Sequence, residues 1–389
     1  MKLIFKREEL CEAVAPLLCG VSSKVTLSAV DGILIEAKTS GECVMTTYDM
    51  EKGMRLSVQA DVVEEGSFII NATKFMHTIR AMSGHDIVLT VDDKLCATIV
   101  SGKSSHTMSA LPGSDFPDIP RLTSPRGFTV SQKVVKSMMA KCMYAMGVND
   151  QRPILNGLYG MVKGSTFTTV ACDSFKMAVC TANTDLENIS EESEGAELNF
   201  KFIVPNKSVN ELYKLLDDKD EEARLGIHLN KKNMIFSLGD KLFFTRIIEG
   251  DYIDYDRIVI KNHRIAVYTD REMLIEALER AALITEEKVV GSVRSHVRLE
   301  IEGNVLKVMA NSSIGSSYDE IPVGHEGDDL VIAFNNRYLM DSLRACTAER
   351  IRLSLSTALT SINIEPASDD ANAGEESELF MLLPVRMKE

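Results

Sequence analysis

The 389-residue sequence contains no tryptophan, and its eight cysteines are scattered without a C-x-x-C pair. This spacing argues against a structural zinc site or a disulfide framework. No apolar run approaches the roughly 20 residues that span a bilayer. The start, MKLIFKREEL, lacks the apolar core of a secretion signal. We therefore predict a cytoplasmic protein with reduced thiols, no metal and no membrane segment.

Catalytic motifs are absent as well. The sequence has no G-x-x-x-x-G-K-[ST] loop, no G-x-G-x-x-G and no G-x-S-x-G elbow. Its seven histidines show no H-x-x-x-H spacing. Asp173 could serve as a catalytic carboxylate, but aspartate in such a turn more often accepts hydrogen bonds from nearby backbone amides. These absences favour a binding or scaffolding protein over an enzyme, with no cofactor.

The balance of charge is acidic, with 43 Lys and Arg against 57 Asp and Glu, a formal charge of −14. Such a balance excludes a protein coated with nucleic-acid-binding charge, although a local basic surface can still exist.

One pattern occurs three times: an apolar strand that turns directly into an amphipathic helix. It reads GSFIINATKFMHTI from Gly66, KFIVPNKSVNELYKLL from Lys201 and LVIAFNNRYLMDSLRA from Leu330. The copies are roughly 130 residues apart, the size of a small domain. We predict an α+β fold of three tandem similar domains, each with two helices on antiparallel sheets, at residues 1–120, 128–250 and 251–389. Further helices are expected at 8–18 and 131–146, and another within 265–285, capped by Thr269 or Asp270. The proline-rich segment 111–121 is expected to be a linker and 379–385 the last strand.

Cations recur on the helices of all three copies, although acidic residues dilute the pattern. A basic helix face is usually only a solvated face, but its recurrence in an acidic protein favours a weak, sequence-blind phosphate surface. The residues concerned are Lys74, Arg80, Lys133, Lys136, Lys141, Lys207, Lys214, Arg337 and Arg344.

Several segments, in order and spacing, resemble the bacterial beta sliding clamp, the processivity ring of the replicative DNA polymerase (polymerase III beta subunit). They are TLSAVDGILIEA at 26–37, the linker at 108–119, RPILNGLYG at 152–160, TVACDSFKMAVC at 169–180, FIVPNKSVNEL at 202–212 and LLPVRM at 382–387. The resemblance implies a head-to-tail homodimer that closes into a six-domain ring around duplex DNA, with helices lining the hole. It adds Lys24 and Asn149 as DNA contacts from loops.

The resemblance also implies a pocket for short peptides of the replicative polymerase, the clamp loader and repair proteins. Its walls would be Arg152, Leu155, Cys172, Ser174, Phe175, Lys176, Met177, Ile253, Arg257, Ile258, Ser361, Met381, Leu382, Leu383, Pro384, Val385 and Arg386. The family turn often reads Asp-Gly-His-Arg-Leu, whereas this chain has Asp-Ser-Phe-Lys-Met from Asp173. Phe175 and Met177 are expected to make the pocket bulkier and more adaptable.

Ring closure would place His106 of one subunit near Leu283 and Ile284 of the next. Two alternatives stay open from the residues alone: a scaffold that binds peptides without encircling DNA, and a hydrolase with an unrecognised site.

Overall fold

The computed structural model describes residues 1–21, 28–190, 197–285, 296–367 and 376–387. The chain divides into two compact units. The first unit comprises Met1–Gln132, Leu186–Ala196 and Lys214–Ile247, and the second comprises Lys133–Asp185, Glu197–Tyr213 and Ile248–Glu389.

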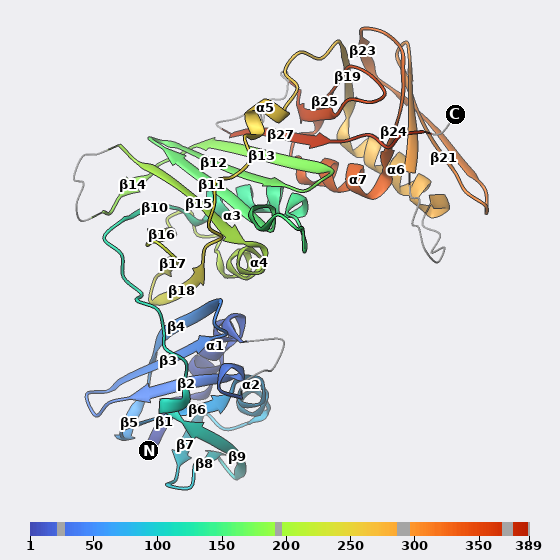
Figure 1. Cartoon of the computed structure of the whole chain (residues 1–389). Helices are drawn as coiled ribbons and strands as arrows, with labels where there is room; N and C mark the ends of the chain where they lie inside the picture. Colours follow the sequence, from blue (N-terminus) through green and yellow to red (C-terminus); the bar gives the residue numbers. More distant parts are fainter. Residues whose placement is uncertain (22–27, 191–196, 286–295, 368–375, 388–389) are drawn as a thin grey trace. The chain divides into compact units, whose positions relative to one another are not determined.

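The described elements fall into three successive sets, each with nine strands and two main helices (Figure 1). The first set is β1 Lys2–Lys6, α1 Arg7–Leu17, β2 Gly32–Ala37, β3 Glu42–Tyr48, β4 Lys52–Gln59, β5 Asp61–Glu64, β6 Gly66–Asn71, α2 Ala72–Ala81, β7 Asp86–Val91, β8 Cys96–Ser101 and β9 Ser104–Pro112. The second set is β10 Gly127–Ser131, α3 Gln132–Cys142, β11 Gly157–Lys163, β12 Thr166–Cys172, β13 Lys176–Asn183, β14 Glu187–Asn188, β15 Asn199–Pro205, α4 Asn206–Leu215, β16 Arg224–Leu229, β17 Asn233–Leu238 and β18 Lys241–Arg246. The third set is β19 Ile265–Asp270, α6 Arg271–Thr285, β20 His296–Glu302, β21 Val305–Asn311, β22 Ser316–Pro322, β23 Gly324–Glu326, β24 Leu330–Asn335, α7 Asn336–Ala345, β25 Arg350–Leu355, β26 Ile362–Pro366 and β27 Glu376–Leu382, preceded by the short helix α5 Tyr255–Ile258.

The sheets are antiparallel at every described pairing. A 14-stranded sheet in the first unit runs β14-β10-β16-β17-β18-β4-β3-β2-β6-β9-β8-β7-β1-β5. The second unit has a nine-stranded sheet, β15-β11-β12-β13-β27-β26-β25-β19-β23, and a four-stranded sheet, β22-β21-β20-β24. Helices α1 and α2 contact each other in the first unit, as do α6 and α7 in the second (Figure 1). The predicted α+β class, with few helices on antiparallel sheets, is confirmed.

The repeated strand-to-helix pattern has a local cause. At the starts of α2 and α7, the side chains of Asn71 and Asn335 accept hydrogen bonds from the backbone amides of Lys74 (2.9 Å) and Tyr338 (3.1 Å). These caps satisfy amides that have no partner within the helix. The second copy has Pro205 immediately before α4. The apolar side of each helix is buried, as Phe75 and Ile79 show on α2.

Two turns are stabilised by the same set of aspartate contacts. Asp49 Oδ1 accepts from the amides of Glu51 (3.0 Å) and Lys52 (2.8 Å), and its other carboxylate oxygen pairs with Lys52 Nζ. Asp173 makes the same contacts after β12. The turn interpretation of Asp173 therefore agrees with its hydrogen bonds.

Several boundaries differ from the sequence expectation. Helix α3 ends at Cys142, and a 3-10 turn continues through Met143–Ala145. Strand β9 extends into the predicted linker as far as Pro112. Part of that linker is packed, because Phe116 and Ile119 contact the buried cluster of Tyr48, Ile235 and Phe244.

Other boundaries agree or shift slightly. Asp270 caps α6 by accepting from the Met273 amide at 2.9 Å. The last strand lies at Glu376–Leu382, slightly earlier than expected. Among the described residues, no helix is long and apolar enough to cross a membrane.

Candidate functional site

The turn between β12 and β13 is held by several contacts. Asp173 Oδ1 accepts from the amides of Phe175 (2.7 Å) and Lys176 (2.8 Å), and its carboxylate pairs with Lys176 Nζ. The same ammonium lies 4.5 Å from the centre of the Tyr338 ring on α7. Lys176 is thus held by both a carboxylate and an aromatic face, and the turn is fixed to α7.

A second loop meets this turn through Arg152. Its guanidinium donates to Ser174 Oγ at 3.0 Å and to Asp150 at 3.2 Å. The hydrogen bond from Arg152 lowers the pKa of the Asp150 carboxyl, so this carboxyl is ionised at neutral pH. Arg152 remains about half exposed, which leaves its charge available to a ligand.

The segment after β27 borders the same turn. The amide of Leu383 donates to the Phe175 carbonyl at 2.9 Å, and that of Val385 donates to the Ala333 carbonyl at 2.7 Å. Five large apolar side chains on this turn, on α5 and on the segment after β27 are exposed: Phe175 (54% exposed), Ile258, Leu383, Val385 and Met387. We call these five residues the apolar patch. An exposed apolar group of this kind is typical of a binding surface.

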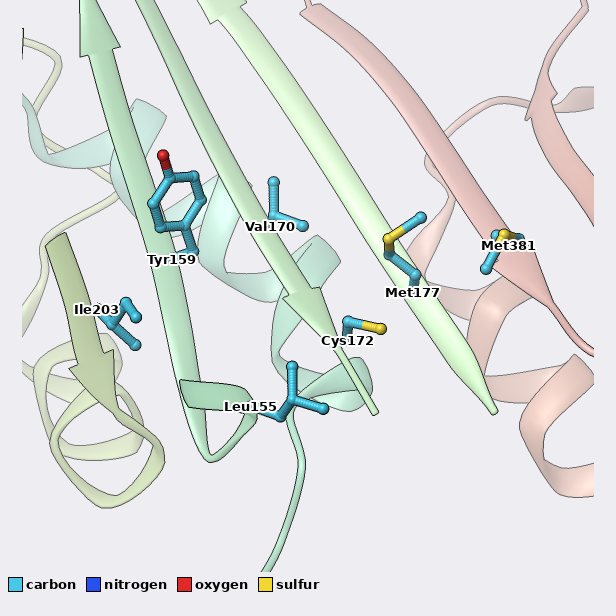
Figure 2. Packing of buried hydrophobic residues seen from close by; sticks show 7 residues of the cluster. All are labelled: Leu155, Tyr159, Val170, Cys172, Met177, Ile203 and Met381. Carbon is cyan, nitrogen blue, oxygen red and sulfur yellow. The ribbon is translucent and has the colours of Figure 1, made fainter. Parts of the chain in front are cut away.

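A buried apolar cluster lies on both sides of this turn, since it contains Cys172 and Met177. It contains Leu155, Tyr159, Val170, Cys172, Met177, Ile203 and Met381 (Figure 2). Met177 on β13 pairs in register with Met381 on β27. Burial raises the pKa of the Cys172 thiol to about 11, so this cysteine is a packing residue rather than a nucleophile.

The segment between β18 and β19 lies on this cluster. Tyr252 stacks on Tyr159 with ring centroids 4.7 Å apart and planes 5° from parallel. Ile253 also packs against the cluster, while Ile258 and Arg257 are exposed. Stacking of Tyr252 therefore positions the residues of this segment that were expected to bind peptides.

The residues of the predicted pocket wall differ in exposure. Seven of the proposed residues are buried and lie below the surface: Leu155, Cys172, Lys176, Met177, Ser361, Met381 and Leu382. In particular, Met177 is 0% exposed, so its side chain cannot make the pocket surface adaptable as expected. The register of β13 against β27 turns it inward. Arg152, Ser174, Phe175, Ile253, Arg257, Ile258, Leu383, Pro384, Val385 and Arg386 are exposed at least in part.

The basic residues are placed less uniformly than the helix pattern suggested. Most are exposed, namely Lys74, Arg80, Lys133, Lys207, Lys214, Arg337 and Arg344. Lys136 is half-buried, with its ammonium 5.7 Å from the Tyr213 ring centre. The uncharged loop residue Asn149 is exposed as well. Arg344 pairs with Glu279 at 2.7 Å, and Arg337 lies 3.9 Å from Asp341. Lys24 lies outside the described residues.

Lys141 is a clear exception. Its ammonium lies 2.7 Å from the Glu378 carboxylate, and both side chains are 6% exposed. Thr347 donates a further hydrogen bond to Glu378 at 2.7 Å. The prediction that Lys141 belongs to an exposed basic face is wrong, because its side chain is buried and paired with Glu378. Glu378 is on β27, far from Lys141 in the sequence, so the pattern of α3 could not show this pair.

Residues expected at the ring closure lie on two surfaces. His106 is exposed on β9. Leu283 is 78% exposed on α6, and Ile284 beside it is partly exposed. The sequence did not point to two further exposed side chains. Ile314 lies just before β22 and Tyr318 within it, and this strand contacts α6. In the sequence, Ile314 and Tyr318 differ from their surroundings only in being apolar residues among polar neighbours.

In the described part of the chain, no group of three or more His, Cys, Asp or Glu side chains could hold a metal ion. Sequence reasoning also missed Asp150 and Tyr338, which hold Arg152 and Lys176. Asp150 has a weak local signal, since it lies two residues before Arg152. Tyr338 has none, because it is distant in sequence.

Comparison with known proteins decides the family. Family models of the DNA polymerase III beta subunit match the N-terminal domain over residues 1–120, the central domain over 129–254 and the C-terminal domain over 256–375. This chain belongs to the beta sliding clamp family. A beta sliding clamp from Proteus mirabilis is 29% identical over 391 residues, with both chains fully covered. The DNA polymerase III beta subunit of Pseudomonas aeruginosa superposes with a TM-score of 0.88 at 25% identity, and a second crystal structure of that clamp, bound to griselimycin, with 0.86 at 25%, each covering both chains fully.

Family membership confirms the resemblance and the three clamp domains. The protein is a DNA sliding clamp of the replicative polymerase, a processivity factor and not an enzyme. The scaffold and hydrolase alternatives are not favoured.

Proposed function

We propose that this clamp acts as a head-to-tail homodimer whose six domains close around duplex DNA. A closed ring holds DNA by topology, so its contacts with phosphate can stay weak and allow sliding. The observation that carries the proposal is the match of all three beta-subunit domains along one chain. We assign the domains to residues 1–120, 128–250 and 251–389 and the protein to the cytoplasm.

Contact with DNA is assigned to the exposed cations and to two loops. Lysine and arginine near phosphates give binding that is independent of sequence and sensitive to salt. The residues are Lys24, Lys74, Arg80, Lys133, Lys136, Asn149, Lys207, Lys214, Arg337 and Arg344; Lys141 is excluded by its burial against Glu378.

The apolar patch, with Arg152 at its edge, is proposed to bind short peptides of the replicative polymerase, the clamp loader and repair proteins. Exposed apolar side chains next to a guanidinium suit an extended peptide with apolar anchors and a nearby carboxylate or carbonyl. That a related clamp of the same fold binds griselimycin supports a ligand site in this family.

Ring closure is proposed to join the β9 surface around His106 to the apolar surface of Leu283, Ile284, Ile314 and Tyr318. Four apolar side chains exposed in a single copy are the kind of surface that a second copy would cover.

Retention on DNA tests the ring. The clamp, assembled on a nicked circular plasmid by its loader, is expected to stay bound through gel filtration and to be lost when a restriction enzyme linearises the circle. As a control, the same enzyme is applied to a circle that lacks its site. Equal loss from both circles would contradict topological binding. The variant Leu283→Asp is expected to give monomers in analytical ultracentrifugation and no retention.

A further inference from the structure

A cleft lies on the nine-stranded sheet of the second unit. Its volume is about 440 Å³, within the range of sites that hold small molecules. Its lining comes from strands β13, β25, β26 and β27 and from residues 255–263, which precede β19. None of the five residues of the apolar patch lines it. The cleft therefore shares no residue with the proposed peptide site.

Asn363, which lines the cleft from β26, has a buried acceptor without a partner. Its side chain is 3% exposed, and its amide nitrogen donates to the Ile260 carbonyl at 3.0 Å. That bond fixes which way the carboxamide points. The oxygen Oδ1 accepts no hydrogen bond from any described residue. Because a buried acceptor without a donor is costly, a ligand with an N–H group would supply a favourable hydrogen bond here.

His263 provides a second hydrogen-bonding position in the lining. Its ring nitrogen Nδ1 lies 3.3 Å from Ser356 Oγ, whereas Nε2 is buried and has no hydrogen-bond partner within the described part of the chain. Burial lowers the pKa of His263, so its ring is neutral at pH 7. Asn363 and His263 are thus polar but uncharged, and they suit a ligand held by hydrogen bonds.

Charged side chains of both signs also line the cleft. Arg352 on β25 and Glu365 on β26 are cross-strand neighbours, and Lys261 is exposed in the segment before β19. None of these three side chains forms an ion pair with another described residue. Asp256 on α5 adds a second carboxylate. The two cations are available to an anionic group, and the carboxylates are available to N–H donors.

Apolar side chains complete the lining. Val179 and Leu379 are paired in register between β13 and β27, and Val259 and Tyr255 join them from the segment before β19. Tyr255 is half-buried, with its ring centroid 6.4 Å from that of Tyr159. A flat heterocycle suits such a lining, because its faces pack on apolar and aromatic groups while its edge carries hydrogen-bond donors.

We propose that the cleft binds a nucleoside phosphate. The base lies against the apolar side chains and donates to Asn363 Oδ1 and to the Glu365 carboxylate, and the phosphate pairs with Lys261 and Arg352. A free amino acid would match the charges but leave most of the volume empty. Inorganic phosphate would use only the cations. The site requires neither the proposed ring nor the proposed peptide contacts.

Calorimetric titration of the full chain with AMP, GMP, CMP and UMP tests the proposal. We expect at least one of these nucleotides to bind with a Kd below about 1 mM. Ribose 5-phosphate and inorganic phosphate lack the base, so each is expected to bind at least about 10-fold more weakly. Binding of no nucleotide, or equally tight binding of inorganic phosphate, would overturn the proposal.

Substitutions in the lining test where the nucleotide binds. Arg352→Gln and Lys261→Gln each remove a cation, and Glu365→Gln replaces an acceptor for the base, so each should raise the Kd about 3- to 10-fold. Lys201→Gln removes an exposed cation of β15 outside the cleft and should leave the Kd unchanged. Thermal melting followed by circular dichroism checks that every variant is folded. Unchanged affinity in Glu365→Gln, or in both cation variants of the cleft, would show that the assignment is wrong.

Discussion

Helices α2 and α7 follow the same kind of strand in two copies of the repeat, yet their cations have different neighbours. On α7, Arg344 pairs with Glu279 of α6 and Arg337 lies near Asp341. On α2, the exposed side chains of Lys74 and Arg80 make no ion pair with any described carboxylate. Helix α3 gives the extreme case, since Lys141 is buried against Glu378. Helices with similar sequence patterns therefore differ in how much positive charge they offer to a phosphate. The difference depends on whether nearby acidic side chains pair with their cations.

The largest expected effect comes from breaking the buried pair. Lys141→Met leaves the Glu378 carboxylate buried without its cation, although Thr347 still donates hydrogen bonds to it. We expect the free energy of unfolding of the second unit to fall by about 3–5 kcal/mol. Urea denaturation, with hydrogen exchange of β27 as a local readout, measures this loss.

The double variant Lys141→Met with Glu378→Gln is the matched control, and it should recover much of the stability because no buried charge is left. A loss below about 1 kcal/mol in Lys141→Met would mean that the ion pair is far weaker than burial of both charges implies.

The next effect concerns the cations of α2. Replacing Lys74 and Arg80 together by glutamine should weaken binding to short duplex DNA at low salt. It should also reduce the slope of log affinity against log salt by about 2, since each phosphate contact contributes roughly 0.9. Fluorescence anisotropy over a series of salt concentrations measures the slope. An unchanged slope would remove α2 from the proposed DNA surface.

The smallest effect is expected on α7. Arg344→Gln should change the slope by less than either α2 substitution alone, because Glu279 already offsets the Arg344 charge. Its effect on stability should stay below about 1 kcal/mol, as for exposed ion pairs generally. If Arg344→Gln lowered the slope as much as Arg80→Gln, pairing with Glu279 would not determine availability, and the contrast between the two helices would fail.

Local signals explain what the sequence predicted well. Asn71, Asn335 and Pro205 mark the starts of helices through contacts within a few residues, so the strand-to-helix repeat was visible. Asp173 marks its turn in the same way. Periodicity located α6, and Asp270 its start.

Long-range pairing explains what was missed. The burial of Lys141 depends on Glu378, and the burial of Met177 depends on the register of β13 against β27. Neither follows from the residues around it. Resemblance to a family predicts which segments would form a peptide pocket, but it could not show which of their side chains reach the surface.

Strand β27 joins two parts of the nine-stranded sheet. It is inserted between β13 and β26 and is the central strand of that sheet. Leu383 and Val385, which belong to the apolar patch, follow it directly. A change that removes β27 from the sheet therefore divides the sheet and displaces part of the patch at once, so the stability of this unit and the proposed peptide binding are coupled through one strand.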